Sequence, residues 1–173
     1  MVAGQAQQLL RRTTHHAGWR YLDVGCGVGA AARQIAGATD LDVTGVDVDP
    51  KQIEASKAGA AHPNLHFIVM DATKLDFSDG EFDIVAASMA THHIPDWERV
   101  LSEMVRVLRN GGYLIYTDFV FPGWLAKSGQ FLIPIMGFPS MPALESLAAR
   151  KGLFKIHESR RLVRTDLIWT KKA

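Results

Sequence analysis

The sequence has one cysteine, almost no surplus of charge of either sign and no long uninterrupted apolar run. Cys26 alone cannot form an internal disulfide, which excludes the small secreted domains that depend on a disulfide framework. The 19 basic and 18 acidic residues give a formal net charge of +1. This balance does not indicate nucleic acid or an anionic membrane as a general partner. Lys127, together with prolines and glycines, interrupts the most apolar stretch, 119–139, so no membrane span is expected.

The length and the first residues set the expected domain organisation. A chain of 173 residues can form one α/β domain with a buried core but not two, so residues 1–173 are expected to form a single domain. Residues 1–20 are expected to be a short N-terminal segment with a helix at 5–12. They lack the charged and then apolar pattern of a secretory signal peptide, so a cytoplasmic location is expected.

Short apolar runs alternate with amphipathic stretches between residues 21 and 119, which is the pattern of βαβ units in a mainly parallel sheet. Strands are predicted at 21–25, 42–47, 65–71, 82–87 and 113–118. The clearest helix is predicted at 97–108, with Asp96 as its N-cap and the glycines of 110–112 closing its C-terminus. A helix at 141–151 and two antiparallel strands, at 154–159 and 167–170, complete a seven-stranded α/β sheet.

A glycine-rich loop follows the first predicted strand. Gly25, Gly27 and Gly29 alternate where the strand turns into a helix, so the backbone there can pass close to a ligand. Because Gly25, Gly27 and Ala30 also satisfy the dinucleotide fingerprint, the glycines alone leave the ligand open. Asp23 beside the loop would repel a pyrophosphate but suits a cationic amino group, such as that of a methionine moiety. The loop therefore favours S-adenosylmethionine over a nicotinamide dinucleotide.

Two further strands are predicted to end in aspartates at the same edge of the sheet. Asp49 precedes Pro50 and fits a helix N-cap, which leaves Asp47 at the strand tip to accept the hydroxyls of a ribose. Asp71 ends the third strand, where it could accept from an adenine amino group or only open a turn. Cys26 has no base near it in the sequence, so it is interpreted as a small loop residue rather than a nucleophile.

Across nearly all of residues 19–172 the sequence resembles the class I S-adenosylmethionine-dependent methyltransferases, particularly small-molecule members of the ubiquinone- and menaquinone-biosynthesis-like group. The motifs that carry the resemblance are 23–29, 45–47, 71–72, 82–88, 92–97 and 106–114. The resemblance implies a Rossmann-like three-layer αβα sandwich with strand order 3-2-1-4-5-7-6 and an antiparallel strand seven. It also implies S-adenosyl-L-methionine as cofactor and S-adenosyl-L-homocysteine as product.

The resemblance assigns the cofactor-binding residues, and no metal site is expected because no ligand spacing supports one. The expected cofactor contacts are Asp23, Gly25, Cys26, Gly27, Asp47, Val48, Asp71, Ala72 and Ser88. Fewer residues precede the first strand than is common in the family, so an open cleft is expected.

The acceptor is predicted to be a small and apolar molecule, because the apolar segment 119–139 lies where the family builds its acceptor wall. The same segment could instead form a homodimer contact. If the acceptor carries an acidic proton, His92 and His93 are the candidate catalytic bases, with Asp118 as a further candidate. Alternative functions are a non-catalytic S-adenosylmethionine-binding module, a methyltransferase acting on a macromolecule and an NAD-dependent oxidoreductase.

Overall fold

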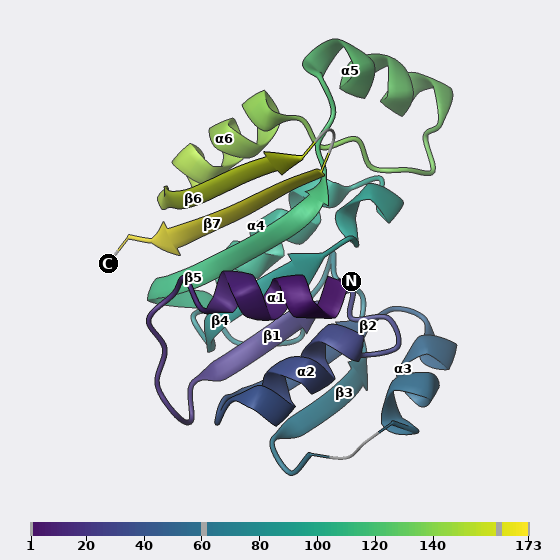
Figure 1. Cartoon of the computed structure of the whole chain (residues 1–173). Helices are drawn as coiled ribbons and strands as arrows, with labels where there is room; N and C mark the ends of the chain where they lie inside the picture. The colour runs from purple at the N-terminus through teal and green to yellow at the C-terminus, as the bar shows by residue number, and fades with distance from the viewer. Residues whose placement is uncertain (1, 60–61, 162–163, 173) are drawn as a thin grey trace.

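The computed structural model describes residues 2–59, 62–161 and 164–172. They form a seven-stranded sheet in the order β3-β2-β1-β4-β5-β7-β6 (Figure 1), which confirms the predicted order. β7 runs antiparallel to both β5 and β6, and the pairs among β1 to β5 are parallel. The strands are β1 (Arg20–Val24), β2 (Asp42–Asp47), β3 (Leu65–Val69), β4 (Phe82–Ser88), β5 (Leu108–Phe119), β6 (Leu153–Arg161) and β7 (Arg164–Lys171).

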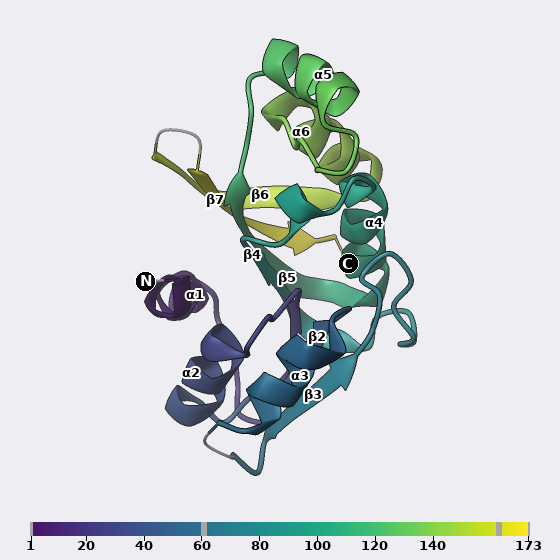
Figure 2. The ribbon, with the colours of Figure 1, turned by 90° about the vertical axis from the view of Figure 1, so that its right-hand side faces the viewer.

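Helices cover both faces of the sheet, so the architecture is the expected three-layer sandwich. Figure 2 shows α1 (Val2–Leu10), α2 (Ala30–Ala38) and α3 (Pro50–Lys57) on one face, with α4 (Trp97–Val107) and α6 (Met141–Arg150) on the other. α5 (Gly123–Leu132) lies beyond these layers, beside α6. Each face has its own apolar core. Leu10, Ile35 and Ile84 belong to the α1 and α2 side, whereas Leu101 and Leu144 belong to the other.

The helix predicted at 97–108 is present, but its C-terminus differs from the prediction. Its apolar stripe is buried, and the Asp96 side chain accepts a hydrogen bond from Arg99 N, as an N-cap does. The prediction that the glycines of 110–112 close this helix is wrong. Leu108 is fully buried in extended conformation opposite Phe82, so β5 begins there and Gly111, with φ 72°, lies inside the strand near a register shift.

The other predicted elements agree with the structure in type. Asp49 caps α3, accepting from Lys51 N at 2.9 Å, and Gly152, with φ 70°, follows α6 in the left-handed conformation. The final two strands form the predicted antiparallel pair. α5 was not predicted. None of the helices in the described part of the chain has the length and apolar character that a bilayer crossing requires.

Candidate active site

The glycine loop between β1 and α2 has a backbone that only glycine adopts readily. Gly25, Gly27 and Gly29 have φ of 70°, 53° and 74°. A Cβ on Gly25 would lie 2.5 Å from the Cβ of Ala90, and a Cβ on Gly29 would overlap the ring of Phe67. Gly25 N and the next amide both donate to the Val46 carbonyl at 2.9 Å, which ties the loop to β2. The loop is therefore fixed against β2, and the absence of side chains at its glycines leaves room for a ligand.

Asp47, at the end of β2, connects the loop to the start of α3. One carboxylate oxygen accepts from Gly27 N at 2.9 Å and the other accepts from Asp49 N at 3.0 Å. Each carboxylate oxygen has more than one acceptor site, so both can still accept from hydroxyl groups of a ligand. Asp47 thus also fixes the backbone of the glycine loop and of the start of α3, which the sequence did not indicate.

Asp71 follows β3 and shapes the turn after it. Its Oδ1 accepts from Thr73 N and from Thr73 Oγ1, both at 2.8 Å. These two hydrogen bonds lower the pKa of the Asp71 carboxyl. The side chain is exposed, and its second oxygen has acceptor capacity for a ligand. Asp71 therefore opens a turn and can also accept from a bound molecule.

A cavity of about 640 Å³ lies over the carboxyl ends of β1 to β4, which is the edge where open α/β sheets bind ligands. The predicted cofactor residues that line it are Gly25, Gly27, Asp47, Val48, Asp71 and Ala72. Asp23, Cys26 and Ser88 are not among its lining residues. The segments that follow β1, β2, β3 and β4 therefore line one common cavity.

Asp23 lies buried in β1, with 3% of its surface exposed. Its Oδ2 is enclosed and has no hydrogen-bond partner among the described residues. Burial raises the pKa of Asp23 to about 7, a backbone hydrogen bond from Ala32 opposes this rise, and the charge of Asp47 adds to it. An orphaned buried carboxylate oxygen beside a ligand cavity suits a cationic or hydrogen-donating group of a ligand.

Cys26 and Ser88 lie close to the cavity but outside its lining. Burial, with the charges of Asp23 and Asp47, raises the pKa of the Cys26 thiol. A thiol in this environment stays protonated and is a poor nucleophile. Ser88 ends β4 and pairs with Thr117 of β5.

The segment after β4 supplies lining residues that the sequence reasoning missed. Met89 is the one non-glycine residue of the described chain with positive φ, 57°, and its amide donates to Thr117 O at 2.7 Å. The further lining residues of this segment are Ala90, Ile94 and Pro95. The strained backbone at Met89 leaves no signal in the sequence. Ile94 and Pro95 lie in the motif 92–97, which was the signal that could have pointed to them.

His92 and Asp118 form a buried pair beneath this segment. His92 Nδ1 lies 2.5 Å from Asp118 Oδ1, and Asp118 is fully buried. Asp118 also accepts from Thr91 N and Thr91 Oγ1, both at 2.7 Å, and from Phe119 N at 2.7 Å. Thr91 Oγ1 in turn lies 2.7 Å from the Tyr116 hydroxyl. The Asp118 carboxylate thus holds the loop after β4 onto the end of β5.

His93, in contrast, is exposed and lines the cavity. Its ring packs on the ring of His92, with centroids 3.9 Å apart. The His92 ring also packs edge-on against the ring of Phe119, with centroids 4.9 Å apart. The His92 carbonyl accepts from Gly137 N at 3.0 Å, which brings the segment 119–139 onto the same loop. Of the two predicted histidines, the structure therefore brings only His93 to the cavity wall.

The cavity is lined by the carboxylates of Asp47 and Asp71, the backbone of the glycine loop and the imidazole of His93. Within the described ranges, no cluster of three or more His, Cys, Asp or Glu side chains could hold a metal ion. The site suits a ligand with a cationic group and several hydroxyls.

Comparison with known proteins shows which family this site belongs to. A family described as "Methyltransferase domain" matches residues 22–116. The chain belongs to this methyltransferase family. The match covers the glycine loop, the aspartates at 23, 47 and 71, and the loop after β4 that carries His92 and His93. The strand order is the one that the resemblance to class I methyltransferases implies.

Individual relatives of this methyltransferase chain are longer than the chain itself. Methyltransferase GfsG of Streptomyces halstedii is 38% identical over 145 residues, which cover 82% of this chain and 51% of that protein. Sterol 24-C-methyltransferase erg6 of Aspergillus fumigatus is 44% identical over 100 residues, covering 55% of this chain and 26% of that protein. The chain thus spans about half or less of the length of these curated relatives.

The fold is shared with solved methyltransferase structures. Phosphoethanolamine N-methyltransferase 2 of Haemonchus contortus, solved in complex with S-adenosyl-L-methionine, superposes with a TM-score of 0.82 at 20% identity. The match covers 98% of this chain and 53% of that one. At this identity the likeness supports the fold alone.

Proposed function

We propose that this chain is an enzyme that transfers the methyl group of S-adenosyl-L-methionine to a small, apolar acceptor and releases S-adenosyl-L-homocysteine. The observation that carries the proposal is the cavity where the glycine loop, Asp47 and Asp71 meet. The sterol methyltransferase among the relatives supports an apolar acceptor for this chain. When bound, S-adenosylmethionine supplies an electrophilic sulfonium methyl group, so the protein has mainly to orient the acceptor and exclude water.

The residues present fit this cofactor. The orphaned Oδ2 of Asp23 provides negative charge below the loop for the ammonium of the methionine moiety, and Gly25 leaves the space that a Cβ would fill. Asp47 would accept from the ribose hydroxyls and Asp71 from the adenine amino group. Val48, with 66% of its surface exposed beside Asp47, would pack against the adenine.

The roles of the two histidines differ in this proposal. His93 reaches the cavity and would accept the proton of an acceptor hydroxyl. His92 is a positioning residue, since it is held by Asp118 and packs on the ring of His93. An acceptor that loses no proton would not need this base.

The proposal is tested by incubating the chain with methyl-labelled S-adenosylmethionine and fractionated cell extract. We expect label in a small, organic-extractable product and formation of S-adenosylhomocysteine. Label in protein or nucleic acid would instead identify a macromolecular acceptor. Binding of the cofactor without transfer of label to any component of any extract fraction would contradict the proposed methyltransferase activity and support a non-catalytic binding module.

The buried Asp23 predicts that cofactor affinity depends on pH. Its pKa of about 7 means that the free protein must lose a proton to present the charge that an ammonium group requires. Affinity for S-adenosylmethionine should therefore rise as pH increases from about 5.5 to 7, by up to about tenfold per pH unit, and then level off. Calorimetry in buffers of different ionisation enthalpy should detect protons released on binding.

Two variants show whether Asp23, and not another carboxylate, causes this pH dependence of cofactor affinity. Asp23→Asn should bind more weakly at pH 7.5 and lose the pH dependence, because no carboxyl remains to ionise. Asp40→Asn, an exposed position in the turn before β2, should keep the wild-type profile. A pH profile that is unchanged in Asp23→Asn would refute this role for Asp23.

We also propose that the apolar surface of α5 and the residues after it contacts a second copy of the chain. This surface consists of Trp124, Phe131, Leu132, Ile133 and Ile135, exposed by 74, 86, 73, 43 and 77%. Five large apolar side chains exposed within twelve residues are unusual on a monomer. The segment 119–139 contains no acidic residue that would oppose such a contact.

Introducing charge into this surface tests the dimer. Phe131→Glu should shift the chain from dimer to monomer in sedimentation velocity at micromolar concentration, because a dimer would bury the new carboxylate. Phe154→Glu is the control, since Phe154 is also exposed but lies on β6. A wild-type chain that stays monomeric at high concentration would count against the dimer.

A further inference from the structure

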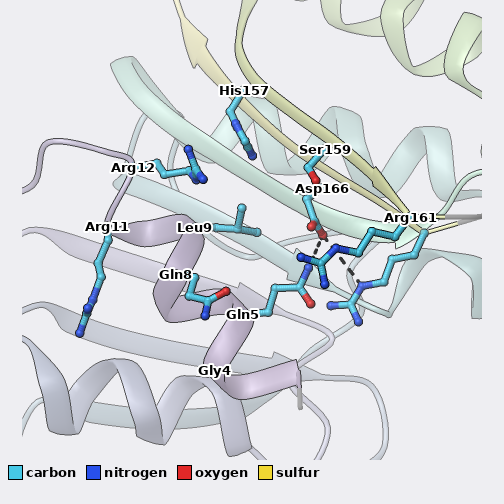
Figure 3. Close-up of a pocket in the computed structure, with 11 residues that line it drawn as sticks. Gly4, Gln5, Gln8, Leu9, Arg11, Arg12, His157, Ser159, Arg161 and Asp166 are labelled. Atoms are coloured by element: carbon cyan, nitrogen blue, oxygen red, sulfur yellow. Dashed lines mark hydrogen bonds and ion pairs between the residues drawn. The ribbon is translucent and has the colours of Figure 1, made fainter.

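A second cavity of about 640 Å³ lies between α1 and the β6 and β7 strands. Figure 3 shows it in close-up, with Gln5 and Gln8 of α1 on one side and His157 and Ser159 of β6 on the other. It shares none of its lining residues with the cavity over β1 to β4. Nothing in the methyltransferase reaction requires it.

The lining of this second cavity is strongly basic. Four of its lining residues are arginines, at positions 11, 12, 161 and 164. Arg12 and Arg161 lie at opposite ends of the cavity in Figure 3. Asp166 is the only carboxylate among the described residues that line it. This surplus of positive charge stands out because the whole chain has a formal net charge of only +1. A concave surface lined by one sign of charge concentrates ions of the opposite sign.

Arg164 has unused hydrogen-bonding capacity. Its Nε and one terminal nitrogen, Nη2, are enclosed and have no hydrogen-bond partner among the described residues. Asp166 Oδ1 lies 3.9 Å from Nε, which is within ion-pair range but beyond hydrogen-bond distance, and it already accepts from Gln5 Nε2 at 2.5 Å. The Arg164 side chain as a whole keeps 27% of its surface exposed. A guanidinium binds a planar or tetrahedral oxyanion through parallel hydrogen bonds.

We propose that the second cavity binds a small molecule that carries two anionic groups, phosphate or carboxylate. Arg161 and the Arg164 guanidinium hold one group, and Arg12 holds the other at the far end. The side chains of Gln8 and Ser159 between them can donate to the body of the ligand. The cavity volume lies within the range of small-molecule sites. This site is independent of methyl transfer.

The test is a calorimetric titration of the chain with pyrophosphate and, separately, with citrate at low ionic strength. We expect saturable binding at one site per chain for at least one probe. Arg161→Gln and Arg164→Gln should each weaken that binding about tenfold, since each removes a charge-assisted hydrogen bond. Arg161 is exposed, so its variant should fold even if Arg164→Gln does not. Preference for one probe assigns phosphate or carboxylate.

Arg150→Gln is the control, because Arg150 is an exposed arginine on α6 and lies outside the cavity. It should leave probe binding unchanged, and Arg161→Gln should leave S-adenosylmethionine binding unchanged. Failure of both probes to saturate would overturn the proposal. So would an equal loss in Arg150→Gln, which would show that the probes respond only to total charge.

Discussion

Asp47→Ala should weaken S-adenosylmethionine binding by about 100-fold. The carboxylate would accept from two ribose hydroxyls, and Asp47 is only partly buried. Hydrogen bonds to a charged acceptor contribute roughly 1.5–3 kcal/mol each, so the low end for the pair, about 3 kcal/mol, corresponds to a loss of about 100-fold. The substitution also frees Gly27 N, which the Asp47 carboxylate holds at 2.9 Å in the glycine loop. Isothermal titration calorimetry of the purified variant measures the loss directly.

Two further variants show whether the loss comes from the carboxylate at this position. Asp42→Ala lies at the opposite end of β2, away from the cavity, and should bind as the wild type does. Asp47→Asn keeps one accepting oxygen, so its affinity should be intermediate. If Asp47→Ala bound the cofactor within about twofold of wild type, the ribose role would be wrong.

Asp118→Ala should be the most destabilising substitution in the site. It leaves buried donors unpaired, among them the amides of Thr91 and Phe119 and the ring nitrogen Nδ1 of His92. Loss of a buried acceptor with several partners costs about 3 kcal/mol or more. For a chain of this size that corresponds to a fall of ~10 °C in Tm, measured by differential scanning calorimetry.

The control for Asp118 is an aspartate in an exposed ion pair. Asp79 contacts Arg106 at 2.8 Å with 82% of its side chain exposed, so Asp79→Ala should cost less than about 1 kcal/mol. Asp118→Asn should retain part of the stability but disturb His93 through His92, lowering kcat more than cofactor affinity. Equal stability of Asp118→Ala and Asp79→Ala would mean that the network around Asp118 contributes little.

The proposed cofactor side of the site follows from the sequence because its signals are local. Glycines at 25, 27 and 29 mark a backbone with positive φ, and a carboxylate directly after an apolar run marks a strand end. The order of strands then brings Asp47 and Asp71 to the same edge. These positions therefore follow from local sequence patterns, without any long-range contact.

The sequence singled out His92, His93 and Asp118 for the proposed acceptor side, but not how they are arranged, because the arrangement depends on contacts between distant segments. The burial of His92 follows from Asp118, which lies 26 residues away in sequence on β5. α5 escaped prediction because Pro122, Gly123 and Gly129 interrupt its apolar pattern, and such residues are typical of loops. The end of α4 was misplaced for a similar reason: burial of Leu108 outweighed the local preference of the glycines.

Competition for labelled S-adenosylmethionine measures the central claim most directly. Equilibrium dialysis of the chain with the labelled cofactor should show one saturable site, from which S-adenosylhomocysteine displaces the label and NAD does not. Asp47→Ala should retain no saturable binding at the same concentrations. Absence of saturable binding in the wild-type chain, or displacement by NAD in preference to S-adenosylhomocysteine, would contradict the account.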